Sequence, residues 1–218
     1  MFKVFSIPYF VLLFLTFPIL LLGKYIKDKK AVYKISFLLF ALEIFKQIYL
    51  LINSKWSIWY VPFQLCSMPL YLFMFKNTFV NKAYLTFIKS YSLLSGFVAL
   101  AYPMDMISHG LILCIHSYIW HYLIILMASI IYYQKLDCAS FSKATLLFII
   151  MCIIATVINI SLNNFGEINM FYINCLLKSY QPIVKDVELI IGRIPANILY
   201  LLVIVGVSYI IDRLEKRN

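Results

Sequence analysis

Long apolar runs separated by short polar segments dominate the pattern of this chain. A helix of roughly 20 apolar residues crosses a bilayer. The pattern therefore predicts an all-α integral membrane protein, a bundle of about seven transmembrane helices in a single domain over residues 1–218. The predicted spans are 4–23, 32–52, 57–75, 83–101, 110–133, 143–162 and 196–212. The long connection 163–195 is too apolar for a linker, so we expect it to fold against the bundle.

Composition and charge agree with a membrane location. Hydrophobic residues make up 64% of the chain and charged residues 13%, against about 25% charged residues in a soluble domain. The net charge of +10 comes from lysine and arginine residues beside the apolar runs, where basic residues determine the orientation of membrane helices. No nucleic-acid partner is therefore expected. The basic residues concentrate in 24–34, 76–82, 135–143 and 213–217. This bias predicts a multi-pass protein of the cell membrane with its amino terminus outside and its carboxyl terminus cytoplasmic.

The five cysteines form no recognisable metal or disulfide pattern. They stand at Cys66, Cys114, Cys138, Cys152 and Cys175, without CxxC spacing. We therefore predict no metal site and no cofactor.

Polar residues interrupt the second predicted span at "ALEIFKQIYL". Glu43, Lys46 and Gln47 are three and four residues apart, which places them on one helical face. A structural ion pair that joins two helices and a role in a functional site are equally good readings, because a buried pair is weak support for either. In the fourth span, Lys89 is expected to snorkel to the cytoplasmic surface or to pair with Glu43. Ser92 and Gly96 form a small-residue pair suited to helix packing.

The third predicted span, "VPFQLCSMPLYLFMF", carries two prolines around a cysteine. Pro62 and Pro69 each remove a backbone hydrogen bond and predict a kinked helix that exposes Cys66 and a free carbonyl to the protein interior. Cys66 is thus either a small packing residue, which spacing alone favours, or a nucleophile.

Two histidines in the fifth span supply a possible base. His116 and His121 point roughly 140° apart around a helix, so both cannot easily face one atom. Glu43, Cys66 and His121 fall at one depth, roughly 14–17 Å from a membrane face. This layer permits a cysteine, a histidine base and an orienting carboxylate, as in catalytic triads. The turn from Asp105 to His109 is expected to be an external loop.

These segments together resemble a known family. "VPFQLCSMPLYL", "HSYIWH" and "EIFKQ", followed by "INISL", "NMFYI", Pro182 and "IGRIPANILYLLV", are similar in order and spacing to the YwaF-type bacterial integral membrane proteins. That group is related to the transmembrane protein 164 family of animals, which are phospholipid acyltransferases. The resemblance covers most of the chain.

The resemblance implies acyl transfer or acyl-ester hydrolysis on membrane lipids. It implies Cys66 as the nucleophile and His121 or His116 as the base, with Gln64 in place of a histidine that many bacterial members carry. Gln64 would donate to a developing oxyanion if the bent backbone turns it toward Cys66. Glu43 and Lys46 are supporting residues. The alternatives are a small proton-coupled transporter and a non-catalytic protein with a structural polar layer; the oligomeric state stays open.

Overall fold

A computed structural model describes residues 6–103, 110–178 and 184–215 of the chain. The predicted turn from Asp105 to His109, Pro182 and the last three residues lie outside this part. Five of the described helices are long and apolar enough to cross a membrane, and residues Ile7–Leu22 form a shorter apolar helical stretch. The chain is therefore a multi-pass helical membrane protein.

Five of the seven predicted spans match described helices of spanning length; 4–23 corresponds to two short helices, α1 and α2, and 57–75 is not an α-helix. The bounds of the helices are α1 Ile7–Phe14, α2 Thr16–Leu22, α3 Ala31–Ile52, α4 Asn81–Phe87, α5 Leu93–Ala101, α7 Leu111–Tyr133, α8 Phe141–Leu162, α9 Val184–Ile191 and α10 Arg193–Glu215. A five-residue π-helix, η3 (Ile88–Ser92), joins α4 to α5. Short 3-10 turns lie at η4 (Asn163–Phe165) and η5 (Met170–Tyr172).

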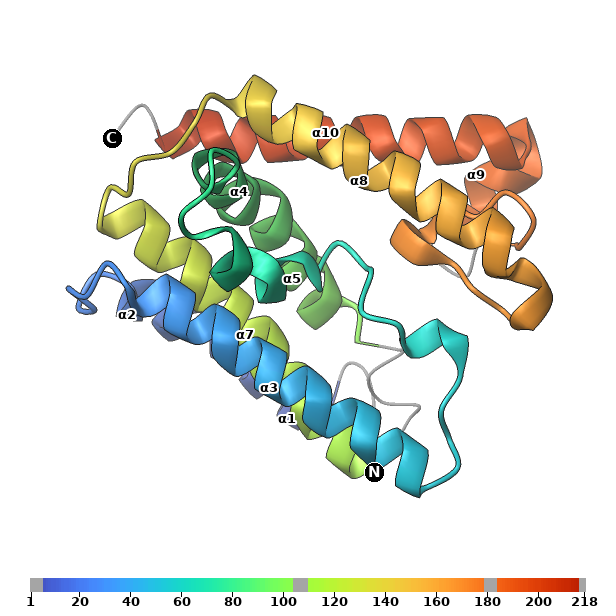
Figure 1. Cartoon of the computed structure of the whole chain (residues 1–218), viewed down its shortest axis with the longest axis horizontal. Coiled ribbons are helices and arrows are strands. Elements are labelled where there is room, and N and C mark those ends of the chain that lie inside the picture. The colour runs from blue at the N-terminus through green and yellow to red at the C-terminus, as the bar shows by residue number, and fades with distance from the viewer. Residues whose placement is uncertain (1–5, 104–109, 179–183, 216–218) are drawn as a thin grey trace.

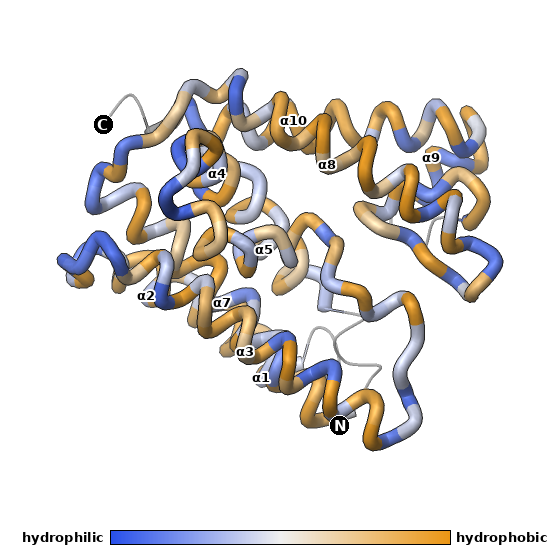
Figure 2. Tube along the Cα trace, in the orientation of Figure 1, coloured by the Kyte–Doolittle hydropathy of each residue, from blue (hydrophilic) through white to orange (hydrophobic). Residues whose placement is uncertain are grey.

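Helix α7 is the centre of the bundle, since α2, α3, η3 and α5 all pack against it. Figure 1 shows α3 beside α7 on one side of the molecule and α8 with α10 on the other. Gly96 permits the close approach of α5 to α7, because a Cβ at this position would lie 3.2 Å from the Ile125 side chain. This contact agrees with the packing role predicted for Ser92 and Gly96. Hydrophobic residues line the outer helices, while polar residues gather in the connections (Figure 2).

The third predicted span is not the kinked α-helix that we expected. Residues 58–60 form a 3-10 turn (η1, Ile58–Tyr60), residues 61–67 are irregular, and η2 (Met68–Phe75) is again a 3-10 helix. The segment still runs back along the molecule from the end of α3 toward the start of α4 (Figure 1). Two prolines remove backbone donors in this segment. Its apolar composition is that of a transmembrane helix, so the hydrophobic pattern alone did not predict the irregular backbone.

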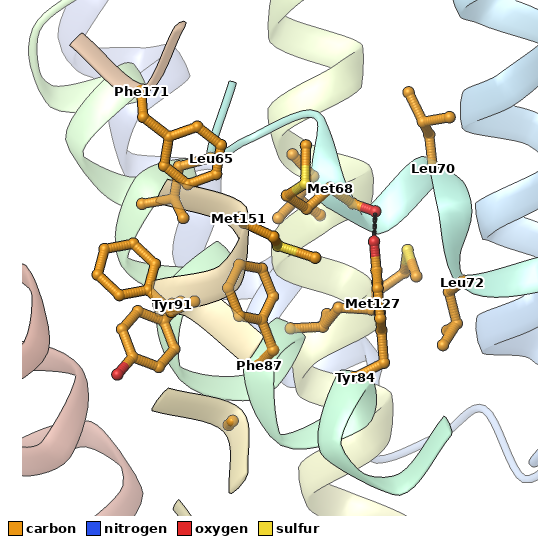
Figure 3. Close-up of a cluster of buried hydrophobic side chains, with 14 of the residues drawn as sticks. Leu65, Met68, Leu70, Leu72, Tyr84, Phe87, Tyr91, Met127, Met151 and Phe171 are labelled. Carbon is orange, nitrogen blue, oxygen red and sulfur yellow. Dashed lines mark hydrogen bonds between the residues drawn. The ribbon is translucent and has the colours of Figure 1, made fainter. Parts of the chain in front are cut away.

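Side chains of neighbouring elements bond the carbonyls that this irregular segment leaves free. Backbone groups at membrane depth need such partners, because lipid supplies none. Five side chains donate to these carbonyls: Gln47 to that of Tyr60, Tyr71 to Pro62, Trp120 to Cys66, Tyr84 to Met68, and Ser36 to Pro69. Figure 3 shows the bond from Tyr84 within the hydrophobic cluster around Met68. The segment is thus built into the protein core.

Lys89 does not snorkel to the surface, nor does it pair with Glu43. It lies in the π-helix η3, and its ammonium is 3.4 Å from the carboxylate of Asp212 on α10. Both side chains are buried, with 8% and 2% of their surface exposed. The π-helix widens the turn at this position, and such insertions are frequent at functional or strained places in helices.

The contact between α2 and α7 leaves no space for a side chain at Gly23. A Cβ there would lie 2.7 Å from the backbone carbonyl carbon of Ser129, whose hydroxyl donates to the carbonyl of Leu20. We expect Gly23→Ala to lower the free energy of unfolding by about 1–3 kcal/mol, because the helices must separate. Unfolding of the purified protein in detergent measures this change.

Gly206 on α10 is the matched control. A Cβ there meets no atom within 4 Å. Gly206→Ala is therefore expected to raise stability by about 1 kcal/mol through helix propensity. Equal effects of the two substitutions would contradict a close α2–α7 contact.

Candidate functional site

The polar face of α3 forms a buried hydrogen-bonded cluster. Glu43 is 5% exposed, and its Oε1 lies 2.7 Å from the Lys46 ammonium and 2.6 Å from Gln47 Nε2. Gln47 also donates to the Tyr60 carbonyl and accepts from the indole of Trp56. Glu43 thus orients Lys46 and Gln47, rather than a histidine as the sequence suggested. The cluster fastens α3 to η1.

Cys66 lies in the irregular segment between this cluster and α7. Its backbone carbonyl accepts a hydrogen bond of 3.1 Å from Trp120 Nε1. Its thiol interacts electrostatically with Lys46 and Glu43. Cys66 therefore contacts α7 through Trp120, the residue that precedes His121.

His116 is committed to a structural contact. Its Nε2 lies 3.0 Å from the carbonyl of Leu42, and a carbonyl can only accept, so Nε2 carries the proton. The ring stacks on Trp120, with the centroids 5.8 Å apart. His116 therefore joins α7 to α3 beside the Glu43 cluster.

His121 has the opposite arrangement. Its Nδ1 lies 2.7 Å from the carbonyl of Ser117, one turn earlier on the same helix, so Nδ1 carries the proton. The residue is 5% exposed, and its Nε2 is buried with no hydrogen-bond partner among the residues that the structure describes. In the neutral ring, Nε2 then presents a free lone pair. This is the tautomer that a general base requires.

Gln64 bonds a different partner from the one that the sequence suggested. Its Nε2 donates to the carbonyl of Asn169 at 3.0 Å, and its Oε1 accepts from the backbone amide of Phe171 at 2.8 Å. The side chain therefore holds the segment 168–174 beside Cys66. Its amide nitrogen has two N–H groups, with the Asn169 carbonyl and, at 4.0 Å, the Met170 sulfur as acceptors, so Gln64 acts as a positioning residue in this structure.

Residues 168–174 form a buried loop, which we call the Asn loop. It lies in the long connection that was expected to fold against the bundle, and this expectation is confirmed for the loop. Phe171 and Tyr172 have φ of 56° and 58°, a backbone conformation that non-glycine residues adopt only when their surroundings impose it. Arg193 donates twice to the Asn174 carbonyl, at 3.1 and 2.9 Å.

Four asparagine side chains hold the Asn loop. Asn159 on α8 bonds both the amide and the carbonyl of Met170, and Asn197 on α10 donates to the carbonyl of Ile173. Within the loop, the side chain of Asn174 donates to the carbonyl of Ile168, and the backbone N–H of Asn174 donates to Asn169 Oδ1. We did not select these residues from the sequence. The available signal was their position as single polar residues between apolar ones, since buried polar groups at membrane depth are expensive.

The described residues contain no group of three or more His, Cys, Asp or Glu side chains that could hold a metal ion. What these residues offer is a thiol, a histidine with a free lone pair, and a partly buried cation paired with a carboxylate. This set suits nucleophilic chemistry by a thiol within the membrane.

Fold and site together define a multi-pass helical membrane protein with a buried polar layer. The chain belongs to the TMEM164 family, whose family model matches residues 2–211. Comparisons with curated proteins and with solved structures give no match.

Proposed function

We propose that this protein transfers or hydrolyses the acyl groups of membrane lipids, with Cys66 as nucleophile and His121 as base. The observation that carries the proposal concerns His121, a buried imidazole whose Nδ1 is fixed by Ser117 and whose Nε2 has no partner in the described part of the chain. Such a group is costly in a protein interior unless it has a role there. The resemblance to phospholipid acyltransferases noted from the sequence favours the same chemistry.

The proposed reaction begins with transfer of the Cys66 thiol proton to His121 Nε2. The sulfur then attacks the ester carbonyl, a carbon–sulfur bond forms, and the carbonyl electron pair moves to oxygen. Collapse of this intermediate breaks the carbon–oxygen bond, and the leaving alcohol takes the proton back from His121. A second alcohol or water then resolves the thioester and regenerates the thiol. Lys46 supplies positive charge near the thiolate, and Glu43 fixes Lys46.

We also propose the setting in which this chemistry occurs. The distribution of lysine and arginine favours the cell membrane, with the amino terminus outside and the carboxyl terminus cytoplasmic. The start of α1 and the end of α10 lie at opposite ends of the molecule (Figure 1), which suits this topology. The order of the sequence motifs quoted above favours a place in the YwaF-type group within the TMEM164 family.

Intact-mass measurement of the detergent-purified protein, incubated with dioleoyl phosphatidylcholine, tests the proposal. Wild-type protein is expected to gain an oleoyl group that hydroxylamine removes, whereas Cys66→Ala gains none and releases no product. Cys175→Ala is the matched control, because Cys175 is an exposed cysteine that follows the buried loop 168–174. Product formation by Cys66→Ala would overturn the assignment of the nucleophile. Absence of both adduct and product in wild type would favour proton-coupled transport instead.

A further inference from the structure

Like His121 Nε2, the side-chain nitrogen of Asn169 in the Asn loop is a buried polar atom without a partner among the described residues. Unlike His121 Nε2, it is a hydrogen-bond donor. Asn169 is fully buried, and its Nδ2 has no hydrogen-bond partner. The identity of this atom is fixed, because the other end of the amide accepts the backbone N–H of Asn174 at 2.8 Å and must therefore be the oxygen. Nδ2 thus presents N–H groups that nothing in the described part of the chain accepts.

The backbone that carries this donor is bonded to the segment that carries the candidate nucleophile. The Asn169 carbonyl accepts from the side chain of Gln64, which precedes Cys66 by two residues. Gln64 and Asn159 hold the two residues that follow Asn169, which fixes the loop from two sides. A donor fixed in this way needs no reorganisation when a negative charge forms beside it.

We propose that Asn169 Nδ2 binds the carbonyl oxygen of the acyl substrate and stabilises the oxyanion that forms when Cys66 attacks. The inference rests on the proposed function and assigns to Asn169 the part that the sequence had suggested for Gln64. It explains why a chain would bury an amide at membrane depth with only its oxygen bonded: the nitrogen's acceptor is the substrate. A substrate of this site is therefore an oxoester or thioester of a fatty acid.

The test compares two electrophiles that react with the same thiol. Attack on p-nitrophenyl decanoate creates an oxyanion, whereas alkylation by iodoacetamide does not. Asn169→Ala is expected to slow acylation of Cys66 at saturating ester by about 10²–10³-fold. Alkylation of Cys66 by iodoacetamide is expected to proceed at the wild-type rate, since it depends on the thiolate and its access alone.

Asn159→Ala is the matched control for damage to the loop. It removes two hydrogen bonds to Met170, of 3.1 and 2.7 Å, but leaves the Asn169 donor in place. Acylation should therefore fall much less in Asn159→Ala than in Asn169→Ala. Equal losses in both variants would mean that Asn169 only supports the loop, and would overturn the inference.

A second variant covers the case in which Asn169→Ala does not fold. Asn169→Asp keeps an acceptor for the Asn174 amide but loses its donor when the carboxyl ionises. Its acylation rate relative to wild type is therefore expected to fall as the pH rises. A ratio independent of pH would overturn the inference.

Failure of the inference and failure of the proposed function are distinguishable. If wild-type Cys66 takes up no decanoyl group, the proposed function fails and the inference with it. If wild type is acylated and Asn169→Ala is acylated equally fast, only the inference fails, and Nδ2 is then assigned to a buried water molecule.

Discussion

Replacing His121 with asparagine is expected to slow acylation of Cys66 by about 10²–10⁴-fold, the usual contribution of a positioned general base. The reason is the lone pair on Nε2, which the bond from Nδ1 to the Ser117 carbonyl fixes in place. Release of nitrophenolate from p-nitrophenyl decanoate, followed in a single turnover, measures the effect. The defect should shrink as the pH rises, because the thiolate then forms without a histidine.

His116→Asn is the control for this experiment. The Nε2 of His116 donates to the Leu42 carbonyl, so its replacement removes a contact between α7 and α3 rather than a free base. Acylation should fall less than in His121→Asn when both variants are folded. A larger loss in His116→Asn would assign the base to His116.

Neutralising one member of the Lys89–Asp212 pair is expected to destabilise the protein by about 3–5 kcal/mol, because the other charge stays buried without its counter-ion. Asp212→Asn and Lys89→Met should both show this loss in detergent unfolding. The double variant Lys89→Met with Asp212→Leu should recover most of it, since two apolar side chains leave no buried charge. The pair joins α10 to η3, so the single variants should loosen α10 first.

The exposed pair between Lys34 and Asp28 is the matched control. Its atoms are closer, at 2.8 Å, but the two side chains are 74% and 45% exposed. Lys34→Ala should therefore leave the unfolding transition unchanged, because water screens such a pair. A double Lys89–Asp212 variant whose loss equals the sum of the two single losses would show that the two charges do not depend on each other.

The long helices could be predicted from the sequence because their apolar runs match the thickness of a bilayer. The segment around Cys66 could not, since its composition is that of a transmembrane helix. What makes it irregular is two prolines together with hydrogen bonds from Trp120, Tyr84 and Ser36, which lie far from it in the sequence. The spacing of hydrophobic residues along the chain does not indicate hydrogen bonds between residues so far apart.

The candidate site was predictable in its residue types but not in its connections. Spacing placed Glu43, Lys46 and Gln47 on one face, and they do bond one another. The partner of Lys89 lies on a helix that no local pattern associates with it. The proton positions on the two histidines depend on which carbonyl each ring meets, which the folded geometry alone decides.

The Asn loop also constrains the order in which the protein assembles in the membrane. Gln64 bonds the loop, and the loop in turn bonds Asn197 and Arg193 at the start of α10. The contacts between Gln64 and the loop can therefore be complete only when α10 is in place. The bonds from Trp120, Tyr84 and Ser36 to the segment around Cys66 need no part of α10.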